Sequence, residues 1–239
     1  EIGVRLVGSE MCIRDRMDTC LYGNKMLISS YMFKNWRIGM SEYVFLFDLD
    51  ATITKVEILP EISAEIGKDK EMRELTERAM RGEIPFERSF RERVSILKDI
   101  PVSKVRKIVE NIPLNEQVAA FIRQNSDRCY VITGNLDIWI EDLMKKLGVG
   151  HSFYCSKAEV KNDRIVGDIQ VIDKATVVNS FDKPFVAIGD GNNDADMIAA
   201  AEIGIGFGGV RDIAPAVLKS ATHAAYSEDK LCQFLKQLL

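Results

Sequence analysis

The sequence contains few residues of the kinds that bind zinc or build disulfide frameworks. It has five cysteines and two histidines among 239 residues. No two cysteines lie at CxxC spacing, and neither histidine joins them in a zinc-binding pattern. This spacing argues against a zinc centre and favours separate thiols in a reducing compartment. The cysteines are Cys12, Cys20, Cys129, Cys155 and Cys232.

Long apolar runs and an excess of positive charge are also absent. No apolar run reaches the roughly 18 residues that span a bilayer, and the N-terminus lacks the basic and apolar regions of a secretory signal. The net charge of -4 disfavours broad binding to nucleic acid or anionic membranes, although it permits a local basic pocket. We therefore expect a cytoplasmic protein without nucleic-acid or membrane partners.

Residues 1–39 lack the periodicity of either a helix or a strand. They precede Met40, a natural start that leads directly into an apolar stretch. Within them, residues 7–16 resemble the translated read-through of a sequencing adapter. We predict that residues 1–39 form a non-native or disordered N-terminal extension outside the fold.

From Met40 onwards, short apolar runs alternate with helical stretches. Uninterrupted runs of strand-forming residues are typical of strands buried on both faces of a parallel sheet. The alternation predicts an α/β fold with a doubly wound parallel sheet, whose ligands bind at the carboxyl ends of the strands. The predicted strands are 43–47, 128–132, 184–188 and 203–207, and the predicted helices include 137–147, 173–180 and 194–201.

Residues 57–114 carry no strand signal. Apolar stripes predict four helices there, with Gly67 and Gly82 as helix stops and Pro85 and Ser103 as helix starts. We therefore predict a helical cap at 57–114, inserted into a core formed by 40–56 and 115–239. The four predicted helices are 58–66, 71–80, 85–98 and 103–112.

Asp48 and Asp50 follow the first predicted strand at positions i and i+2. Two carboxylates with this spacing at a strand end can point into one crevice. One can attack a phosphorus atom, and the other can protonate the leaving oxygen and later take a proton from water. The alternative is an acidic turn that only caps the following helix.

A second acidic cluster, Asp190 and Asp194 with Asn193 between them, follows the predicted strand 184–188. Carboxylates are hard oxygen ligands, and a small number of them around a partly hydrated ion suits Mg²⁺. A glycine-rich turn with a helix cap would explain the same residues. This cluster therefore leaves both a magnesium site and a capped turn open.

Thr133 and Gly134 follow the middle predicted strand, where a hydroxyl and backbone N–H groups would suit a phosphoryl oxygen. Lys174 begins the predicted helix 173–180. Each feature alone has an ordinary explanation, as a capped turn or a solvated lysine. Together with the two acidic clusters they occur in chain order, mostly at predicted strand ends, and this conjunction favours a single active site.

This constellation resembles the haloacid dehalogenase-like (HAD) phosphatase superfamily, and closely its phosphoserine phosphatase branch, over about residues 43–239. The resemblance implies a Rossmannoid core with a helical cap, and Mg²⁺-dependent hydrolysis of O-phospho-L-serine or another small phosphorylated metabolite. Asp48 would be the nucleophile, kept ionised by Lys174, and Asp50 the general acid and base. The implied catalytic residues are Asp48, Asp50, Thr133 and Lys174. The implied magnesium ligands are Asp48, the backbone carbonyl of Asp50, Asp190 and Asp194.

The predicted cap carries further matches to this branch. The resemblance implies that Glu57 pairs with the substrate ammonium, that Arg93 binds its carboxylate through two parallel donors, and that Met80 and Phe86 exclude water. Without the resemblance, Met80 and Phe86 would be core residues of the cap, and Arg93 a solvated charge on a helix. The implied substrate-binding residues are Glu57, Met80, Phe86, Arg93, Thr133, Gly134 and Asn193.

Some positions depart from the family pattern. Ala51 stands where the family usually has Ser, and Thr133-Gly134-Asn135-Leu136 replaces the usual Ser-Gly-Gly-Phe. Asn135 replaces a glycine beside the phosphate, which leaves the exact substrate open. The alternatives are phosphoryl transfer to an acceptor alcohol such as homoserine, hydrolysis of a different phosphomonoester, and non-catalytic sensing of a phosphorylated ligand.

Overall fold

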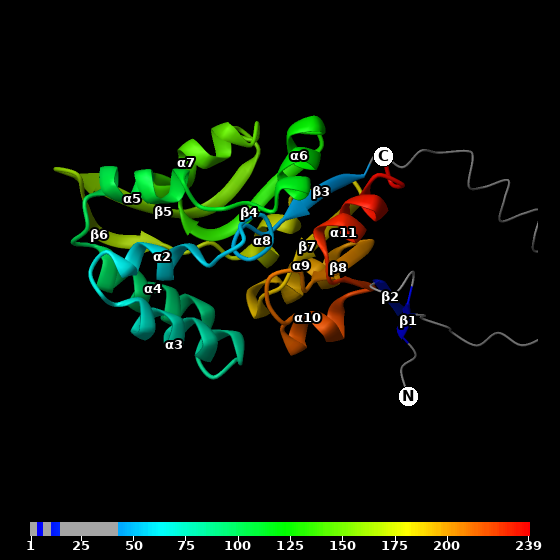
Figure 1. Ribbon diagram of the computed structural model, residues 1–239, viewed down its shortest axis with the longest axis horizontal. Helices are drawn as coiled ribbons and strands as arrows, with labels where there is room; N and C mark the ends of the chain where they lie inside the picture. The colour runs from blue at the N-terminus through cyan, green and yellow to red at the C-terminus, as the bar shows by residue number, and fades with distance from the viewer. Residues whose placement is uncertain (1–3, 7–10, 15–42) are drawn as a thin grey trace, which may run out of the picture.

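The computed structural model describes residues 4–6, 11–14 and 43–239, which are built around one sheet of nine strands (Figure 1). The strands are β1 (Val4–Leu6), β2 (Met11–Arg14), β3 (Val44–Phe47), β4 (Cys129–Leu136), β5 (Phe153–Lys161), β6 (Arg164–Gln170), β7 (Phe185–Gly189), β8 (Ile203–Phe207) and β9 (His223–Ala225). Their order across the sheet is β1-β2-β9-β8-β7-β3-β4-β5-β6. Strands β3, β7 and β8 lie where the sequence predicted them.

The central strands are parallel and wind outward in both directions from β3. Strand β3 pairs in parallel with β4 on one side and with β7 on the other. Strands β5, β8 and β9 extend the parallel region, while β1, β2 and β6 pair in antiparallel fashion. The predicted doubly wound sheet is confirmed. Because the winding direction reverses at β3, the loops after β3, β4 and β7 leave a crevice at their carboxyl ends.

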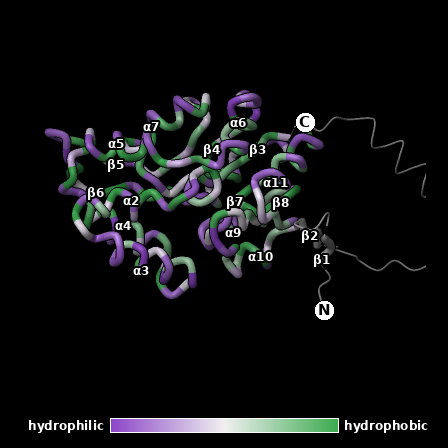
Figure 2. The backbone as a smooth tube through the Cα atoms, viewed as in Figure 1, coloured by the Kyte–Doolittle hydropathy of each residue, from purple (hydrophilic) through white to green (hydrophobic). Residues whose placement is uncertain are grey.

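Two hydrophobic cores cover the two faces of the sheet because residues alternate along β3. Phe45 and Phe47 pack with Phe121 of α6 (Glu116–Gln124) and with residues of α11 (Glu228–Leu235). Val44 and Leu46 face the opposite core, formed with α8 (Lys174–Val178), α9 (Ala195–Ala200) and α10 (Pro215–Ser220). Hydrophobic residues accordingly recur in the strands, whereas hydrophilic residues are frequent on outer helices such as α3 (Asp69–Met80) (Figure 2).

The four helices predicted for residues 57–114 are present. Gly67 and Gly82 both have positive φ angles just beyond helix ends, as their predicted role requires. The last helix begins after Pro101 rather than at Ser103, because proline favours the start of a helix. Figure 1 shows α3 and α4 together beyond the sheet, whereas α5 lies beside α7. The helices are α2 (Ile58–Ala64), α3 (Asp69–Met80), α4 (Phe86–Leu97) and α5 (Val102–Glu110), and α7 is Asp137–Lys146. The exact boundary between cap and core stays a prediction.

A β-hairpin formed by β5 and β6 was not expected from the sequence. Its turn residues Asn162 and Asp163 have φ angles of 51° and 61°, the positive values that a two-residue type I′ hairpin turn requires. The hairpin is hydrogen-bonded to the helices α4 and α5. Ser103 donates its hydroxyl to Asp163 at 2.6 Å, and Arg91 of α4 donates to Asp168 at 2.6 Å.

The N-terminal segment contributes two strands to the sheet. Strand β1 pairs with β2, and β2 pairs with β9, although the sequence showed no strand periodicity there. The rest of the predicted extension lies outside the described residues.

Among the described residues, no helix combines the length and apolar character needed to cross a bilayer. Cys129, Cys155 and Cys232 are free thiols.

Candidate active site

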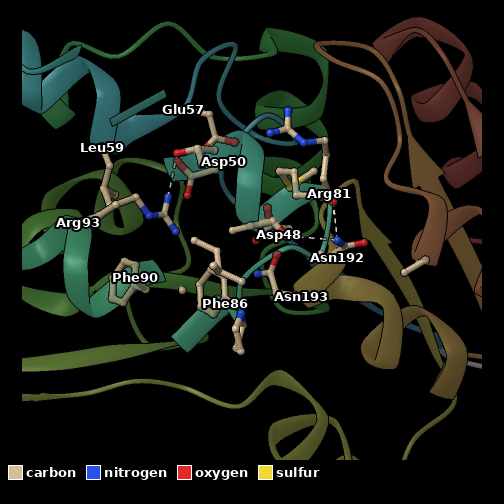
Figure 3. Close-up of a pocket in the computed structure, with 18 of the residues that line it drawn as sticks. Asp48, Asp50, Glu57, Leu59, Arg81, Phe86, Phe90, Arg93, Asn192 and Asn193 are labelled. Carbon is tan, nitrogen blue, oxygen red and sulfur yellow. Dashed lines mark hydrogen bonds between the residues drawn. The ribbon is translucent and has the colours of Figure 1, made fainter. Parts of the chain in front are cut away.

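A pocket of about 590 Å³ opens between the carboxyl ends of the central strands and the helices α3 and α4 (Figure 3). Asp48 and Asp50, which follow β3, form one wall. Phe86 and Arg93 of α4 also line the pocket, and Figure 3 shows Glu57 and Arg93 near Asp50. The sequence-predicted residues that line this pocket are Asp48, Asp50, Glu57, Met80, Phe86, Arg93, Gly134 and Asn193.

Three carboxylates meet beneath the pocket floor. Asp48, Asp190 and Asp194 each offer an oxygen within 4.8 Å of the others, and all three are buried. The Lys174 ammonium binds Asp48 and lies 2.6 Å from Asp194. Thr52 donates its hydroxyl to the Oδ1 atom of Asp190 at 3.2 Å. The sheet thus brings together acids that are far apart in the sequence.

The electrostatics of this cluster favour an additional cation. Burial, and then the negative charge of Asp194, raises the pKa of Asp48 to about 7, although Lys174 acts in the opposite direction. Burial likewise raises the pKa of Asp190 well above its ordinary value. The Lys174 ammonium lowers the pKa of Asp48, which is the direction that the resemblance implies, but burial acts more strongly in the opposite direction. Three hard oxygen donors with incomplete charge compensation fit a divalent metal ion, which would lower the pKa of each carboxyl.

Asp50 has different surroundings from Asp48. Its Oδ1 atom accepts the backbone N–H of Ile58 at 2.8 Å, and its Oδ2 atom accepts the side-chain amide of Asn135. Burial, followed by the charges of Glu57 and Asp48, raises the pKa of Asp50 to about 8. A carboxyl group with such a pKa carries a proton at neutral pH, as a general acid must.

Arg93 is a buried cation on the cap side of the pocket. Its side chain donates to the Thr76 hydroxyl at 3.1 Å and to the Ser89 carbonyl at 3.3 Å. The guanidinium carbon lies 6.0 Å and 5.8 Å from the ring centroids of Phe86 and Phe90. Arg93 is only 5% exposed, so the interpretation of a solvated helix charge is wrong. No carboxylate of the described residues forms a salt bridge with it, and burial lowers its pKa.

The Thr133 to Leu136 segment lies inside β4 rather than in the turn after it. The pairing of β4 with β5 shifts register between Ile132 and Leu136, which places an irregular stretch next to the pocket. Thr133 is buried, and its hydroxyl accepts the backbone N–H of Asn135 at 3.2 Å. Thr133 and Lys174 are not among the residues that line the pocket.

Gly134 allows α4 to approach the end of β4 closely. A Cβ atom at Gly134 would lie 2.3 Å from Cζ of Phe86, so a larger residue would displace the ring. Asn192, just before Asn193, donates its side-chain amide to the Met80 carbonyl and to the Ala79 carbonyl at 3.2 Å. These contacts connect the loop that follows β7 with α3.

Arg211 is a site residue that the sequence did not reveal. It follows β8, lines the pocket and pairs with the carboxylates of both Glu57 and Asp190. Burial alone would lower its pKa, but these carboxylates raise it. A single arginine in a loop has no distinctive local pattern, and its partners lie far away in the sequence. Only the fold therefore identifies it.

Comparison with known proteins agrees with this geometry. The haloacid dehalogenase-like hydrolase family matches residues 45–199. This chain belongs to that family. Among HAD relatives, the phosphoserine phosphatase of Methanocaldococcus jannaschii is 30% identical over 210 residues, covering 82% of this chain and 97% of that protein. The phosphoserine phosphatase of Archaeoglobus fulgidus is 34% identical over 203 residues, covering 79% of this chain and 57% of that protein.

Solved HAD structures give the same result. A phosphoserine phosphatase with an analogue of its phospho-aspartyl intermediate has a TM-score of 0.70 and 29% identity, covering 82% of this chain and 98% of that one. A substrate-bound phosphoserine phosphatase also has a TM-score of 0.70 with 29% identity, and its coverage is 82% and 97%. The carboxylate pair after β3 and the acids after β7 both lie within the residues that the family matches.

Proposed function

We propose that this HAD hydrolase is a Mg²⁺-dependent phosphatase that converts O-phospho-L-serine to serine and phosphate through a phospho-aspartate at Asp48. The observation that carries the proposal is that one pocket holds both a pair of acids and a cation. Asp48, which is buried, and Asp50, which is partly buried, line this pocket together with Arg93, a buried cation that forms no salt bridge with a carboxylate of the described residues. The names of the relatives and solved structures support the same substrate.

In the first step, a carboxylate oxygen of Asp48 attacks the phosphorus atom, and the bond from phosphorus to the serine oxygen breaks. Asp50 donates its proton to that departing oxygen, for which its raised pKa prepares it. In the second step, Asp50 takes a proton from water, whose oxygen attacks the same phosphorus atom. This step releases phosphate and restores the Asp48 carboxylate.

The metal site would be formed by Asp48, Asp190 and Asp194, with the backbone carbonyl of Asp50 as a further ligand. A bound Mg²⁺ ion would supply positive charge against the phosphoryl oxygens. Lys174 adds an ammonium next to Asp48, and Thr133 and Gly134 offer a hydroxyl and a backbone N–H from β4. We place this chemistry in the cytoplasm, where small phosphorylated metabolites occur.

The cap side of the pocket would recognise the amino-acid part of the substrate. The guanidinium of Arg93 has N–H donors left for the substrate carboxylate, because among the described residues it donates to a hydroxyl and a carbonyl oxygen rather than to a carboxylate. A desolvated guanidinium binds a carboxylate strongly. Phe86 and Met80 line the same pocket and would limit access of water.

A phosphate-release screen with Mg²⁺ tests the proposal. The full chain would be assayed against phosphoserine, phosphothreonine, sugar phosphates and nucleotides, and we expect the highest kcat/KM for phosphoserine. Parallel reactions with added acceptor alcohols would reveal a phosphorylated acceptor if the enzyme were a phosphotransferase. A preference for a substrate without a carboxylate would contradict the role of Arg93, and no release from any substrate would contradict the phosphatase function.

A further inference from the structure

Asn192 connects the end of helix α3 with the loop that carries two of the proposed metal ligands. It stands between Asp190 and Asp194 in the sequence and lines the pocket (Figure 3). Its side-chain amide donates to the Met80 carbonyl and, at 3.2 Å, to the Ala79 carbonyl. A carbonyl oxygen only accepts hydrogen bonds, so the amide nitrogen of Asn192 faces α3. Because a carbonyl does not titrate, this orientation is independent of pH.

The end of α3 has a carbonyl that the helix itself leaves without a donor. The last carbonyls of an α-helix have no N–H group of a following turn to accept. Gly82, with a φ angle of 73°, ends the helical path, and its N–H donates to the Ala79 carbonyl at 3.0 Å. Met80 is the last residue of α3, and Asn192 supplies the donor to its carbonyl. Asn192 thus caps α3 from 112 residues further along the chain.

A second contact joins the same two segments. A Cβ atom at Gly191 would lie 3.4 Å from Sδ of Met80, so the methionine side chain packs against the turn of the loop. Asp194 fixes this turn, because its Oδ2 atom accepts the backbone N–H groups of Asp190 at 3.1 Å and of Gly191 at 2.8 Å. The acids that would hold the metal therefore also fix the segment from which Asn192 reaches α3.

We propose that Asn192 is a positioning residue, which couples the order of the metal-ligand loop to the end of α3 and thereby places Met80 in the pocket. The proposal rests on the metal site and the phosphoserine hydrolysis proposed above. With Asp190 and Asp194 fixed as ligands, Asn192 holds the last turn of α3 against the loop. Without its amide, the Met80 carbonyl turns to water and the last turn of α3 frays.

Amide hydrogen exchange of the full chain, in chelator and in Mg²⁺, tests this coupling. The N–H groups of Asp190 and Gly191 report on the loop, and those of Gly82 and Glu83, which donate to carbonyls of α3, report on the helix end. In the wild type we expect Mg²⁺ to slow exchange at both places. In Asn192→Ala it should slow exchange in the loop alone, and exchange at the helix end should be about fivefold faster than in the wild type, as the loss of one hydrogen bond implies.

Asn125→Ala is the matched control. Asn125 is also partly buried, and it donates its side-chain amide to the Phe121 carbonyl at 2.8 Å at the end of α6, outside the pocket. This variant should respond to Mg²⁺ as the wild type does. If Mg²⁺ still slows exchange at the end of α3 in Asn192→Ala, the role of Asn192 is overturned while the metal site stands. If Mg²⁺ leaves the wild-type loop unchanged, the metal site is overturned, and the role of Asn192 with it.

Steady-state kinetics give a second readout. Met80 lines the pocket, and Asp48 and Asp50 keep their own contacts in Asn192→Ala. We therefore expect KM for phosphoserine to rise about fivefold and kcat to fall by less than about twofold. Asn125→Ala should change neither value. A fall in kcat with an unchanged KM overturns the positioning role. Hydrogen exchange needs no substrate, so a wild type without activity toward phosphoserine overturns the proposed function separately.

Discussion

Asp48 and Asp50 are two positions apart, but their partners differ. Lys174 binds Asp48, and an ammonium favours the ionised form of a carboxyl group. Asp50 receives hydrogen bonds from neutral N–H groups of Ile58 and Asn135 and lies near the negative charge of Glu57. These surroundings support the proposed roles of Asp48 as nucleophile and Asp50 as proton carrier.

Replacing Asp48 and replacing Asp50 should therefore impair turnover in different ways. Asp48→Asn should remove nearly all turnover, because an amide is a poor nucleophile. Asp50→Asn should also lose turnover, yet it should still form phospho-enzyme from an activated aryl phosphate, whose leaving group needs no proton. Phosphate release and trapped phospho-enzyme would be measured for both variants. Near-normal turnover of Asp48→Asn would exclude its role as nucleophile.

Arg93 offers a test of substrate recognition. Arg93→Ala should cost roughly 2–4 kcal/mol in kcat/KM for phosphoserine, as expected for the loss of a desolvated charge pair. It should cost little for para-nitrophenyl phosphate, which has no carboxylate. Measuring kcat/KM for both substrates with the wild type and with Arg93→Ala tests this difference. An equal loss for the two substrates would mean that Arg93 supports the cap without binding the carboxylate.

Arg211 joins Glu57 to Asp190, one of the proposed metal ligands. In Arg211→Met the buried Asp190 and the partly buried Glu57 lose a cation. The metal-free protein should then lose about 2 kcal/mol of unfolding free energy, a value reduced to allow for solvent screening because the Arg211 side chain is 26% exposed. Mg²⁺ should restore part of the loss. Denaturant unfolding with chelator and with Mg²⁺ measures both effects. The exposed Arg81→Met is the control, and an equal loss there would argue against a specific role of Arg211.

At the scale of elements, the contact between β4 and α4 sets the shape of the pocket. Phe86 of α4 lies directly over Gly134 of β4. The hairpin of β5 and β6 supports the same region through Arg91, which bonds Asp168 and the Ile169 carbonyl at 2.9 Å. Helix α4 is thus in contact with both β4 and the hairpin of β5 and β6.

Gly134→Ala should disturb this contact. The added Cβ atom would lie 2.3 Å from the Phe86 ring, and the enforced shift should destabilise the protein by about 1–3 kcal/mol. Phe86→Ala in the same chain should relieve the clash, so the two substitutions should not be additive. Unfolding free energies of both single variants and the double variant test this. Additive losses would show that the ring and the strand do not interact.

At the scale of the whole molecule, the site concentrates acids whose pKa values burial raises. For Asp48 and Asp50 the values rise from 3.8 to about 7 and about 8. The folded protein then binds protons that the unfolded chain releases at lower pH. Between about pH 4 and pH 8 the unfolding free energy contributed by these groups falls as pH rises.

The metal-free protein should therefore lose stability across this window relative to Asp50→Asn, which lacks one of the titrating groups. The difference in unfolding free energy should change by up to about 1.4 kcal/mol per pH unit for one group. Stabilisation by Mg²⁺ should grow with pH, because metal binding requires the ionised carboxylates. Denaturant unfolding at several pH values, in chelator and in Mg²⁺, provides the measurement. A difference that is constant with pH would contradict the raised pKa of Asp50.

The sequence alone determined the strands β3, β7 and β8 and the acids that follow β3 and β7. These features are local, because a buried parallel strand is an uninterrupted apolar run and its carboxyl end needs a turn. The meeting of those acids at one edge follows from parallel pairing, and it was predicted. The helices over residues 57–114 were also predicted, since their apolar stripes have helical periodicity.

Tertiary structure alone decided which side chains complete the site. The pairing of Arg211 with Glu57, the hydrogen bond from Asn135 to Asp50 and the burial of Arg93 all depend on residues distant in sequence. The hairpin of β5 and β6 and the extension of β4 through Thr133 also depend on pairing between strands. Local patterns reflect periodicity and turn chemistry, whereas charge pairing and burial are settled only when the folded chain brings separate segments into contact.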